Sequence, residues 1–162
     1  MFIFHAAVVG AGTMGGEIAQ VIAAADLPVI LKDVDQRYVD TGLAKAEEVT
    51  RTQLAGLVRK ERLTQEQADA RATEILGRIT GTTSYAGFGS VDFVIEAVPE
   101  RMELKRSVFA ELDTVCPGHA VLASNTSSLS VTEMADATGR PDKVVGFHFF
   151  WPAAFMLSLI HI

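Results

Sequence analysis

A glycine-rich loop near the amino terminus has the spacing of a dinucleotide phosphate-binding turn. It consists of Gly10, Ala11, Gly12, Thr13, Met14 and Gly15. An apolar segment at 6–9 precedes the loop and apolar residues at helical spacing follow it, which predicts a strand–loop–helix unit. In such a unit the first glycine allows the tight turn, the second lets the backbone approach a pyrophosphate, and the third lets helix and strand pack closely. The free N–H groups at the helix start would face the phosphates.

An acid at the end of the next apolar segment adds a second cofactor-binding feature. Asp33 follows the segment 28–31 and lies 18 residues past Gly15. A carboxylate near this distance accepts hydrogen bonds from the adenosine ribose hydroxyls, and it repels a 2′-phosphate. The sequence therefore predicts NAD as the cofactor, while the adjacent cation Lys32 keeps NADP open as an alternative.

Two further groups that could do chemistry lie at later apolar segments. The run 124–128, Ser-Asn-Thr-Ser-Ser, follows the segment 120–123, and His148 lies near the end of the segment 144–149. The polar run is either a helix cap with its loop or a set of donors aimed at a ligand. The imidazole is either structural or a base, since histidine ordinarily titrates at a pKa of about 6.5 and the oxidation of an alcohol needs a base.

An acid and a lysine follow the segment 91–97 in the same way. Glu100 and Lys105 come directly after this apolar run. By themselves they are an ordinary loop acid and a lysine on a helix surface. The carboxyl ends of parallel strands meet at one edge of a sheet, however, so we expect all these segments to open onto one crevice.

Apolar runs alternate with helical periodicity along the whole chain. Strands are expected at 6–9, 28–31, 79–82, 91–97, 120–123 and 144–149. Helices are expected after Gly15, over 36–60, after a capping-box-like Thr64 and Gln67, and around 104–115. This order predicts an α/β fold: a Rossmann-type, doubly wound, mostly parallel sheet with helices on both faces and a helical arm inserted after the second strand.

Length and composition exclude several classes of protein. The 162 residues suit one α/β domain, and the net charge of −6 argues against a nucleic-acid partner. The single cysteine, Cys116, cannot form an internal disulfide and fits a reducing compartment. The longest uncharged stretch, 144–162, contains Pro152 and two histidines, which makes it a poor membrane span. We therefore expect a cytoplasmic protein that does not enter a membrane.

Four motifs in this order resemble the L-3-hydroxyacyl-CoA dehydrogenases of fatty-acid β-oxidation. They are the glycine loop, the segment 94–100 (Val-Ile-Glu-Ala-Val-Pro-Glu), the polar run 124–128 and the segment 148–150 (His-Phe-Phe). The resemblance covers about residues 5–156. It is nearest to the dehydrogenase portion of bacterial multifunctional enzymes, and stand-alone 3-hydroxybutyryl-CoA dehydrogenases are also similar. Dehydrogenases of the 3-hydroxyisobutyrate or 6-phosphogluconate type share the glycine loop but lack the later motifs.

The resemblance implies an NAD cofactor, an acyl-CoA substrate and a role for each matched residue. His148 would take the proton of the 3-hydroxyl group as general base. Ser127 would hydrogen-bond the reacting oxygen, and Asn125 would support that site. Glu100 and Lys105 would contact NAD on its ribose and nicotinamide side. The helical segment 39–62 would form the arm that helps to hold the CoA moiety.

The chain departs from the family pattern near its end. Trp151 stands where the family has asparagine, and Ile160 stands where it has the glutamate that pairs with the histidine. We also expect the helical second domain of the family to be absent from this chain. We therefore expect an NAD-binding domain at 1–156 and an atypical tail at 157–162 that is foreign to the parent sequence. The alternative to an active dehydrogenase domain is a catalytically silent NAD-binding fragment.

The apolar residues near the carboxyl terminus carry one more expectation. The segment 147–160 is rich in aromatic and aliphatic side chains that would normally pack against the missing domain. Large exposed apolar patches are uncommon on monomers. We therefore expect the chain to form homo-oligomers through this segment.

Overall fold

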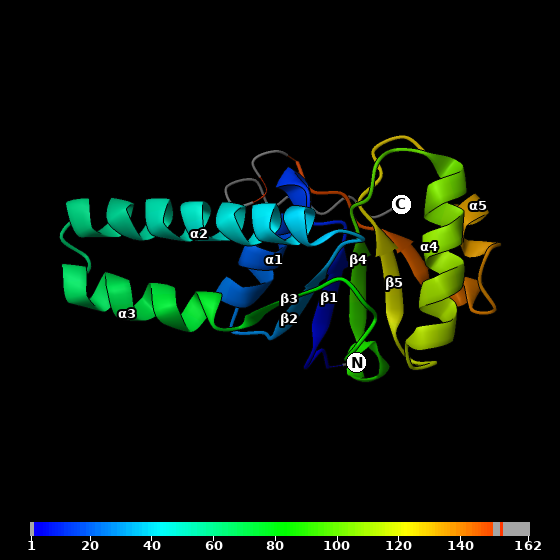
Figure 1. The fold of residues 1–162 in the computed structure, drawn as a ribbon, viewed down its shortest axis with the longest axis horizontal. Helices are drawn as coiled ribbons and strands as arrows, with labels where there is room; N and C mark the ends of the chain where they lie inside the picture. The colour runs from blue at the N-terminus through cyan, green and yellow to red at the C-terminus, as the bar shows by residue number, and fades with distance from the viewer. Residues whose placement is uncertain (1, 151–152, 154–162) are drawn as a thin grey trace.

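A six-stranded parallel sheet forms the centre of the computed structural model, which describes residues 2–150 and 153 (Figure 1). Its strands are β1 (Ala6–Val9), β2 (Val29–Lys32), β3 (Ile79–Thr82), β4 (Phe93–Glu96), β5 (Val121–Ser124) and β6 (Val144–Gly146). They lie in the order β3-β2-β1-β4-β5-β6. The chain winds outward from β1 in both directions, so the switch point lies between β1 and β4. The predicted doubly wound, Rossmann-type fold is confirmed.

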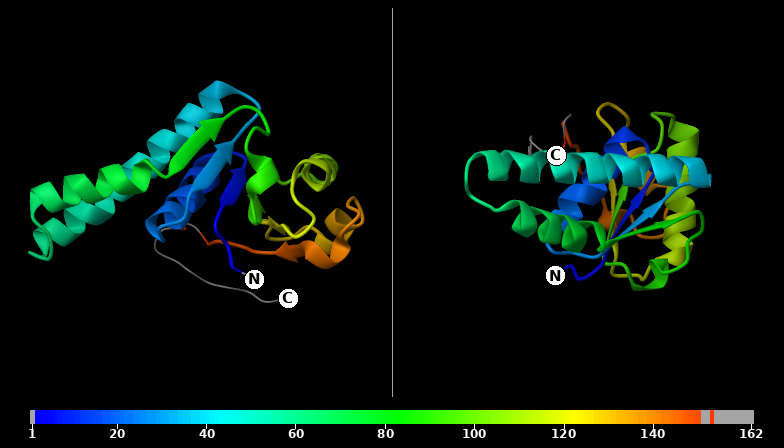
Figure 2. Two further views of the ribbon diagram at one scale, coloured as in Figure 1. Left: turned by 90° about the horizontal axis from the view of Figure 1, so that it is seen from below. Right: turned by 60° about the vertical axis from the view of Figure 1, so that its left-hand side comes forward.

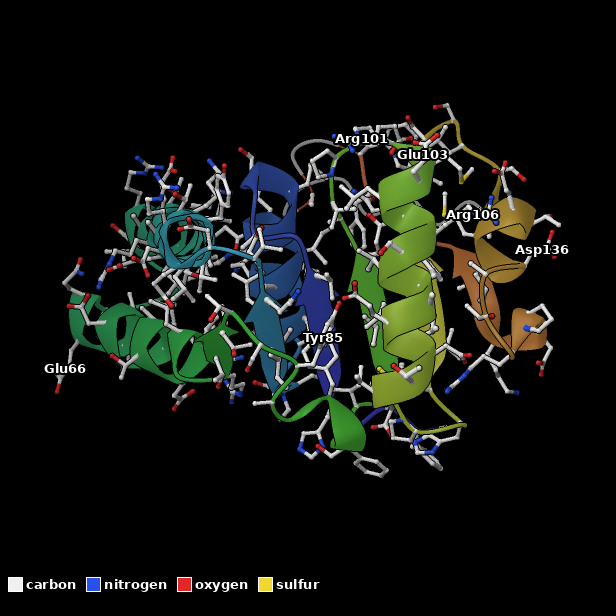
Figure 3. The ribbon with its side chains drawn as sticks, turned by 45° about the vertical axis from the view of Figure 1, so that its right-hand side comes forward. Glu66, Tyr85, Arg101, Glu103, Arg106 and Asp136 are labelled. Carbon is white, nitrogen blue, oxygen red and sulfur yellow. The ribbon has the colours of Figure 1, made fainter. Side chains whose placement is uncertain are left out.

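Helices cover both faces of this sheet. Successive strand residues point to opposite sides, and both sets are apolar, so each face needs a cover. They are α1 (Thr13–Ala24), α2 (Gln36–Arg59), α3 (Gln65–Leu76), α4 (Met102–Val115) and α5 (Val131–Ala135), with short 3-10 turns at Phe88–Ser90 and Pro141–Lys143. In β1, Ala6 and Val8 pack in one buried cluster with α1, whereas Ala7 and Val9 pack in a second cluster with α4 and α5. Figure 3 shows the polar outer side of α4, with Arg101, Glu103 and Arg106 around its start.

The helices α2 and α3 form the predicted arm, which extends away from the sheet as an antiparallel hairpin (Figure 2). Asp35 caps α2 by accepting a hydrogen bond from the Arg37 N–H. The expected capping box at the start of α3 is confirmed: Thr64 and Gln67 each accept from the other's backbone N–H. A small apolar cluster around Leu54 holds the two helices together. The arm is therefore a locally encoded element with its own core.

The last strand ends earlier than the sequence predicted. The segment 144–149 was expected to be extended throughout, but β6 ends at Gly146. The neighbouring strand β5 ends at Ser124, so the backbone ladder stops there. The Phe149 N–H instead donates to Oδ1 of Asn125 at 2.8 Å. The Phe147 N–H still donates to the Ser124 carbonyl at 2.9 Å, so the side-chain amide replaces a strand carbonyl only at Phe149.

Part of the carboxyl-terminal segment lies outside the described residues. This applies to Trp151, to Ile160 and to the tail 157–162. The predictions made for these positions therefore stay predictions. Among the described residues, no helix is long and apolar enough to cross a bilayer.

Candidate functional site

The carboxyl ends of the central strands bring three loops together at one edge of the sheet. Gly10 donates its N–H to the Lys32 carbonyl at 2.8 Å, so the glycine loop starts beside the end of β2. Ala97 donates to the carbonyl of Val9, and Asn125 donates to the carbonyl of Glu96. The loops that follow β1, β4 and β5 therefore leave the sheet side by side, as the sequence predicted.

Each glycine of the loop meets a different steric demand. Gly10 has φ +102°, and a Cβ there would lie 2.6 Å from the Ala97 carbonyl atoms. A Cβ on Gly15 would lie 1.7 Å from the Gly10 oxygen, so α1 packs directly on the turn. At Gly12, by contrast, no atom lies within 4 Å of the added Cβ.

The open space at Gly12 lies at the start of α1. Gly12 is the residue that precedes this helix, and it has no side chain to cap the free N–H groups. Thr13 is exposed and Met14 is half-buried in the same turn. A helix start of this kind binds phosphate through its N–H groups and its positive dipole end. The residues at this turn fit the pyrophosphate of a dinucleotide.

Asp33 connects the end of β2 to the glycine loop. Its Oδ2 accepts a hydrogen bond from the Ala11 N–H at 2.7 Å, and its Oδ1 accepts from the Val34 N–H at 2.7 Å. The sequence predicted a ribose ligand here but not this second role, in which the carboxylate anchors the loop. The contact with the Ala11 N–H could not be predicted from the sequence, because a backbone N–H is present at every residue except proline.

Lys32 contacts Tyr85, whereas its neighbour Asp33 contacts the glycine loop. The Lys32 side chain is buried, and Nζ lies 4.3 Å from the ring centroid of Tyr85 in a cation–π contact. The lysine that kept NADP open as an alternative is thus held away from the Asp33 carboxylate. This placement favours NAD over NADP.

Glu100 organises the polar loop that follows β5. One carboxylate oxygen accepts hydrogen bonds from the Thr126 hydroxyl at 2.5 Å, the Ser127 N–H at 3.2 Å and the Ser128 hydroxyl at 3.4 Å. Partial burial raises the pKa of Glu100, but the hydrogen bonds from Thr126 and from Lys105 outweigh it and hold this pKa below its ordinary value. The run 124–128 is therefore more than a helix cap, because an acid from the loop after β4 fixes it.

Lys105 is buried, so its interpretation as a surface lysine is wrong. Its side chain is 1% exposed, and Nζ lies 2.7 Å and 3.0 Å from the two oxygens of Glu96. Glu96 is also fully buried and accepts a hydrogen bond from the Ser124 hydroxyl at 2.6 Å. Sequence reasoning missed Glu96. The sequence does carry a signal for it, because Glu96 is the one acid in the otherwise apolar strand β4. An acid in such a strand must be paired if it is buried.

His148 shares a small cavity with the polar loop. This cavity has a volume of about 180 Å³, and its lining includes Ser127, Ser128 and His148. The imidazole is half-buried and lies edge-on to Phe150, with ring centroids 4.9 Å apart. Within the described part of the chain, no acid is hydrogen-bonded to it. The predicted base and the predicted hydroxyl ligand of the substrate oxygen thus line one cavity.

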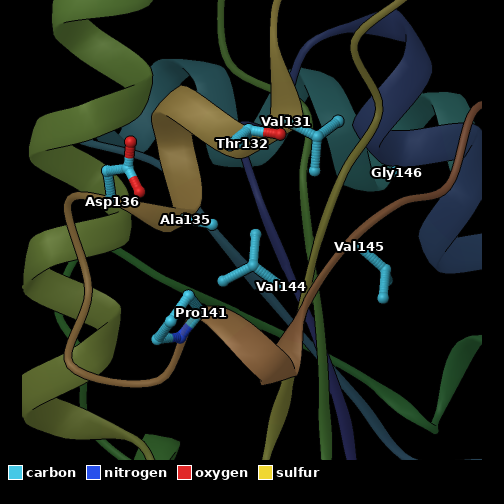
Figure 4. A pocket seen from close by; sticks show the side chains of 8 residues that line it. All are labelled: Val131, Thr132, Ala135, Asp136, Pro141, Val144, Val145 and Gly146. Atoms are coloured by element: carbon cyan, nitrogen blue, oxygen red, sulfur yellow. The ribbon is translucent and has the colours of Figure 1, made fainter.

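A larger hollow lies elsewhere, between α5 and β6 (Figure 4). Its volume is about 400 Å³, and its lining is mainly apolar, with Val131, Val144 and Pro141 beside Asp136. None of the predicted site residues lines it. Among the described residues, no group of three His, Cys, Asp or Glu side chains could hold a metal ion.

The doubly wound sheet, the open glycine turn and the acid after β2 define a dinucleotide-binding domain of the Rossmann type. Residues 5–160 match the family described as 3-hydroxyacyl-CoA dehydrogenase, NAD binding domain. The chain therefore belongs to this family, and NAD is its cofactor.

Known proteins similar to the chain include both long and short dehydrogenases. It is 42% identical over 158 residues to the fatty acid oxidation complex subunit alpha of Pseudomonas savastanoi, covering 98% of this chain and 21% of that protein. It is also 42% identical to a 3-hydroxybutyryl-CoA dehydrogenase of Clostridioides difficile, covering 96% of this chain and 52% of that protein. The crystal structure of (S)-3-hydroxybutyryl-CoA dehydrogenase from Ralstonia eutropha superposes with a TM-score of 0.83 at 38% identity, covering 96% of this chain and 52% of that one. The chain thus spans between a fifth and a half of the length of these relatives.

Proposed function

We propose that this chain is the NAD-binding part of an enzyme that oxidises the 3-hydroxyl group of a 3-hydroxyacyl-CoA to a 3-oxo group in fatty-acid β-oxidation. The cavity shared by Ser127 and His148 carries the proposal, because it joins a hydroxyl donor and a base just after the carboxyl ends of β5 and β6. The relatives named as 3-hydroxybutyryl-CoA dehydrogenases and as subunits of fatty acid oxidation complexes support this reaction class.

The proposed reaction gives each side chain one task. NAD supplies the hydride acceptor when it is bound. His148 takes the proton from the substrate hydroxyl as the carbon–hydrogen bond breaks. The Ser127 hydroxyl hydrogen-bonds the oxygen that becomes the carbonyl, and Asn125 holds the His148 segment through the Phe149 N–H. Glu100 and Lys105 would lie near the nicotinamide ribose.

A reverse-reaction assay tests this function directly. We expect the chain to bind NADH and to oxidise it when acetoacetyl-CoA is added. Binding without oxidation would favour the alternative of a catalytically silent NAD-binding fragment. Absence of NADH binding would contradict both assignments.

Replacing Asp33 with asparagine is expected to weaken NADH binding by about tenfold to a hundredfold, because a charge-assisted hydrogen bond contributes roughly 1.5–3 kcal/mol. The substituted side chain would lack the negative charge that orders the Ala11 N–H and that attracts the ribose hydroxyls. A fluorescence titration with NADH measures the loss. Asp35→Asn is the matched control, since Asp35 caps α2 and an asparagine there still accepts from Arg37. Equal affinities of wild type and Asp33→Asn would refute the assignment.

Self-association and a cytoplasmic location stay predictions. Phe150 and Val145 are each 38% exposed near the end of the described chain, which supports association through this apolar region. Sedimentation velocity should show an oligomer at high protein concentration, and a strict monomer there would contradict the proposal. One plant relative is named as peroxisomal, so relatives of this chain differ in compartment.

A further inference from the structure

A buried cluster of charges lies directly under the polar loop, and the proposed reaction leaves part of it without a task. Glu96 from β4, Lys105 from α4 and Ser124 from β5 are each at most 1% exposed. Charged side chains are almost never buried this completely unless they are paired. Side chains from β5 and α4 therefore converge on the buried Glu96 carboxylate of β4, which accepts hydrogen bonds from Ser124 and Lys105.

Two carboxylates and one backbone carbonyl surround the ammonium group of Lys105. Nζ lies within 3.0 Å of both Glu96 oxygens, 3.2 Å from Oε2 of Glu100 and 3.3 Å from the carbonyl of Val98. An ammonium group has only three N–H donors. The two carboxylates share one cation, so the position of Glu100 depends on how Glu96 holds Lys105.

Glu100 passes this constraint to the residues that line the cavity. Its side chain is 40% exposed, unlike that of Glu96, and its Oε1 accepts from the Thr126 hydroxyl and the Ser127 N–H. Glu96 also contacts the loop directly, because it accepts a hydrogen bond from the Ser124 hydroxyl. The polar loop is thus attached to the cluster at its first residue and at its centre.

We propose that Glu96 is a positioning residue, which acts through Lys105 and Glu100 and through Ser124 to hold Ser127 in place beside His148. The proposal rests on the proposed function only in taking Ser127 as the group that contacts the substrate oxygen. The coupling between Glu96 and Ser127 itself can be measured without substrate.

The first test is an NMR pH titration of the full 162-residue chain. In the wild type, the Ser127 amide should follow the titration of Glu100, with a midpoint below the ordinary glutamate value because Thr126 and Lys105 hold that pKa down. In Glu96→Gln, Lys105 keeps only one carboxylate and draws Glu100 away from the loop. We expect the Ser127 amide to lose its dependence on this titration. A Ser127 titration identical to that of the wild type would overturn the proposal.

The second test separates positioning from stability. The double variant Glu96→Gln/Lys105→Met removes both charges, so it should recover stability relative to Glu96→Gln. It should not recover the Ser127 titration, because Glu100 then loses Lys105, the cation that anchors it beside the loop. Recovery of both would overturn the proposal. Asp113→Asn is the matched control, since it breaks the ion pair with Arg140 at the far end of α4 and should leave the Ser127 titration unchanged.

Turnover adds a third readout in a wild type that oxidises NADH. Small displacements of reacting groups cost up to about a hundredfold in rate, so Glu96→Gln should lower kcat by about tenfold or more. A kcat equal to that of the wild type would overturn the proposal. A wild type without turnover contradicts the proposed function alone, and the NMR titration still decides the role of Glu96.

Discussion

Replacing His148 with alanine is expected to lower acetoacetyl-CoA-dependent NADH oxidation by about 10²–10⁴-fold, the usual contribution of a general acid–base group. In this direction His148 returns a proton to the carbonyl oxygen, and alanine cannot do so. NADH affinity should stay within about twofold of the wild type, because the glycine turn and Asp33 are untouched. Steady-state rates and a fluorescence titration on the same preparation measure the two quantities.

His119 provides the matched control for this substitution. It is exposed, and its ring lies 3.0 Å from Asp92 at the amino end of the sheet, opposite the crevice. His119→Ala should therefore keep both turnover and NADH affinity. Full turnover in His148→Ala would refute the base assignment. A parallel loss of NADH affinity would instead indicate that the imidazole holds the cofactor.

The cofactor half of the site could be predicted because its determinants are local in sequence. Gly10, Gly12 and Gly15 lie within one strand–loop–helix unit, and Asp33 directly follows the next strand. The turn, the helix start and the parallel pairing of β1 with β2 follow from a short stretch of chain. Spacing alone then specifies which atoms meet.

The buried cluster could not be predicted in the same way. Glu96 and Lys105 are nine residues apart on a strand and a helix, and the burial of their charges depends on how α4 packs on the sheet. An isolated lysine on a predicted helix is ordinarily exposed, because burial of a charge requires a partner that the local pattern does not name. The Glu100 contacts with the polar loop span 26 to 28 residues. Tertiary packing decides these contacts, whereas periodicity does not.

The meeting of Ser127 with His148 is an intermediate case. Parallel pairing of β5 with β6 brings both residues to one edge of the sheet, as expected because the carboxyl ends of parallel strands meet there. The exact end of β6 did not follow, because the Asn125 side chain takes over the hydrogen bond to Phe149. Topology placed the residues together, while a single side-chain contact set their approach.

Replacing Gly15 with alanine is expected to destabilise the fold by about 4 kcal/mol or more, which is at the severe end for a single substitution. The added Cβ would lie 1.7 Å from the Gly10 carbonyl oxygen and 3.5 Å from Cγ1 of Val8. Both belong to the central strand and its turn, so α1 would have to move off the sheet. Urea unfolding followed by circular dichroism measures the change.

Gly12→Ala should give the opposite pattern in the same loop. Gly12 has φ −67° and ψ −171°, which alanine adopts readily, and its added Cβ meets no atom within 4 Å. Stability should therefore change by less than about 1 kcal/mol. The methyl group would occupy the space through which the pyrophosphate approaches the backbone, so NADH affinity should fall by about tenfold, or roughly 1.4 kcal/mol. If Gly12→Ala bound NADH as tightly as the wild type, the open space at this turn would not be the phosphate site.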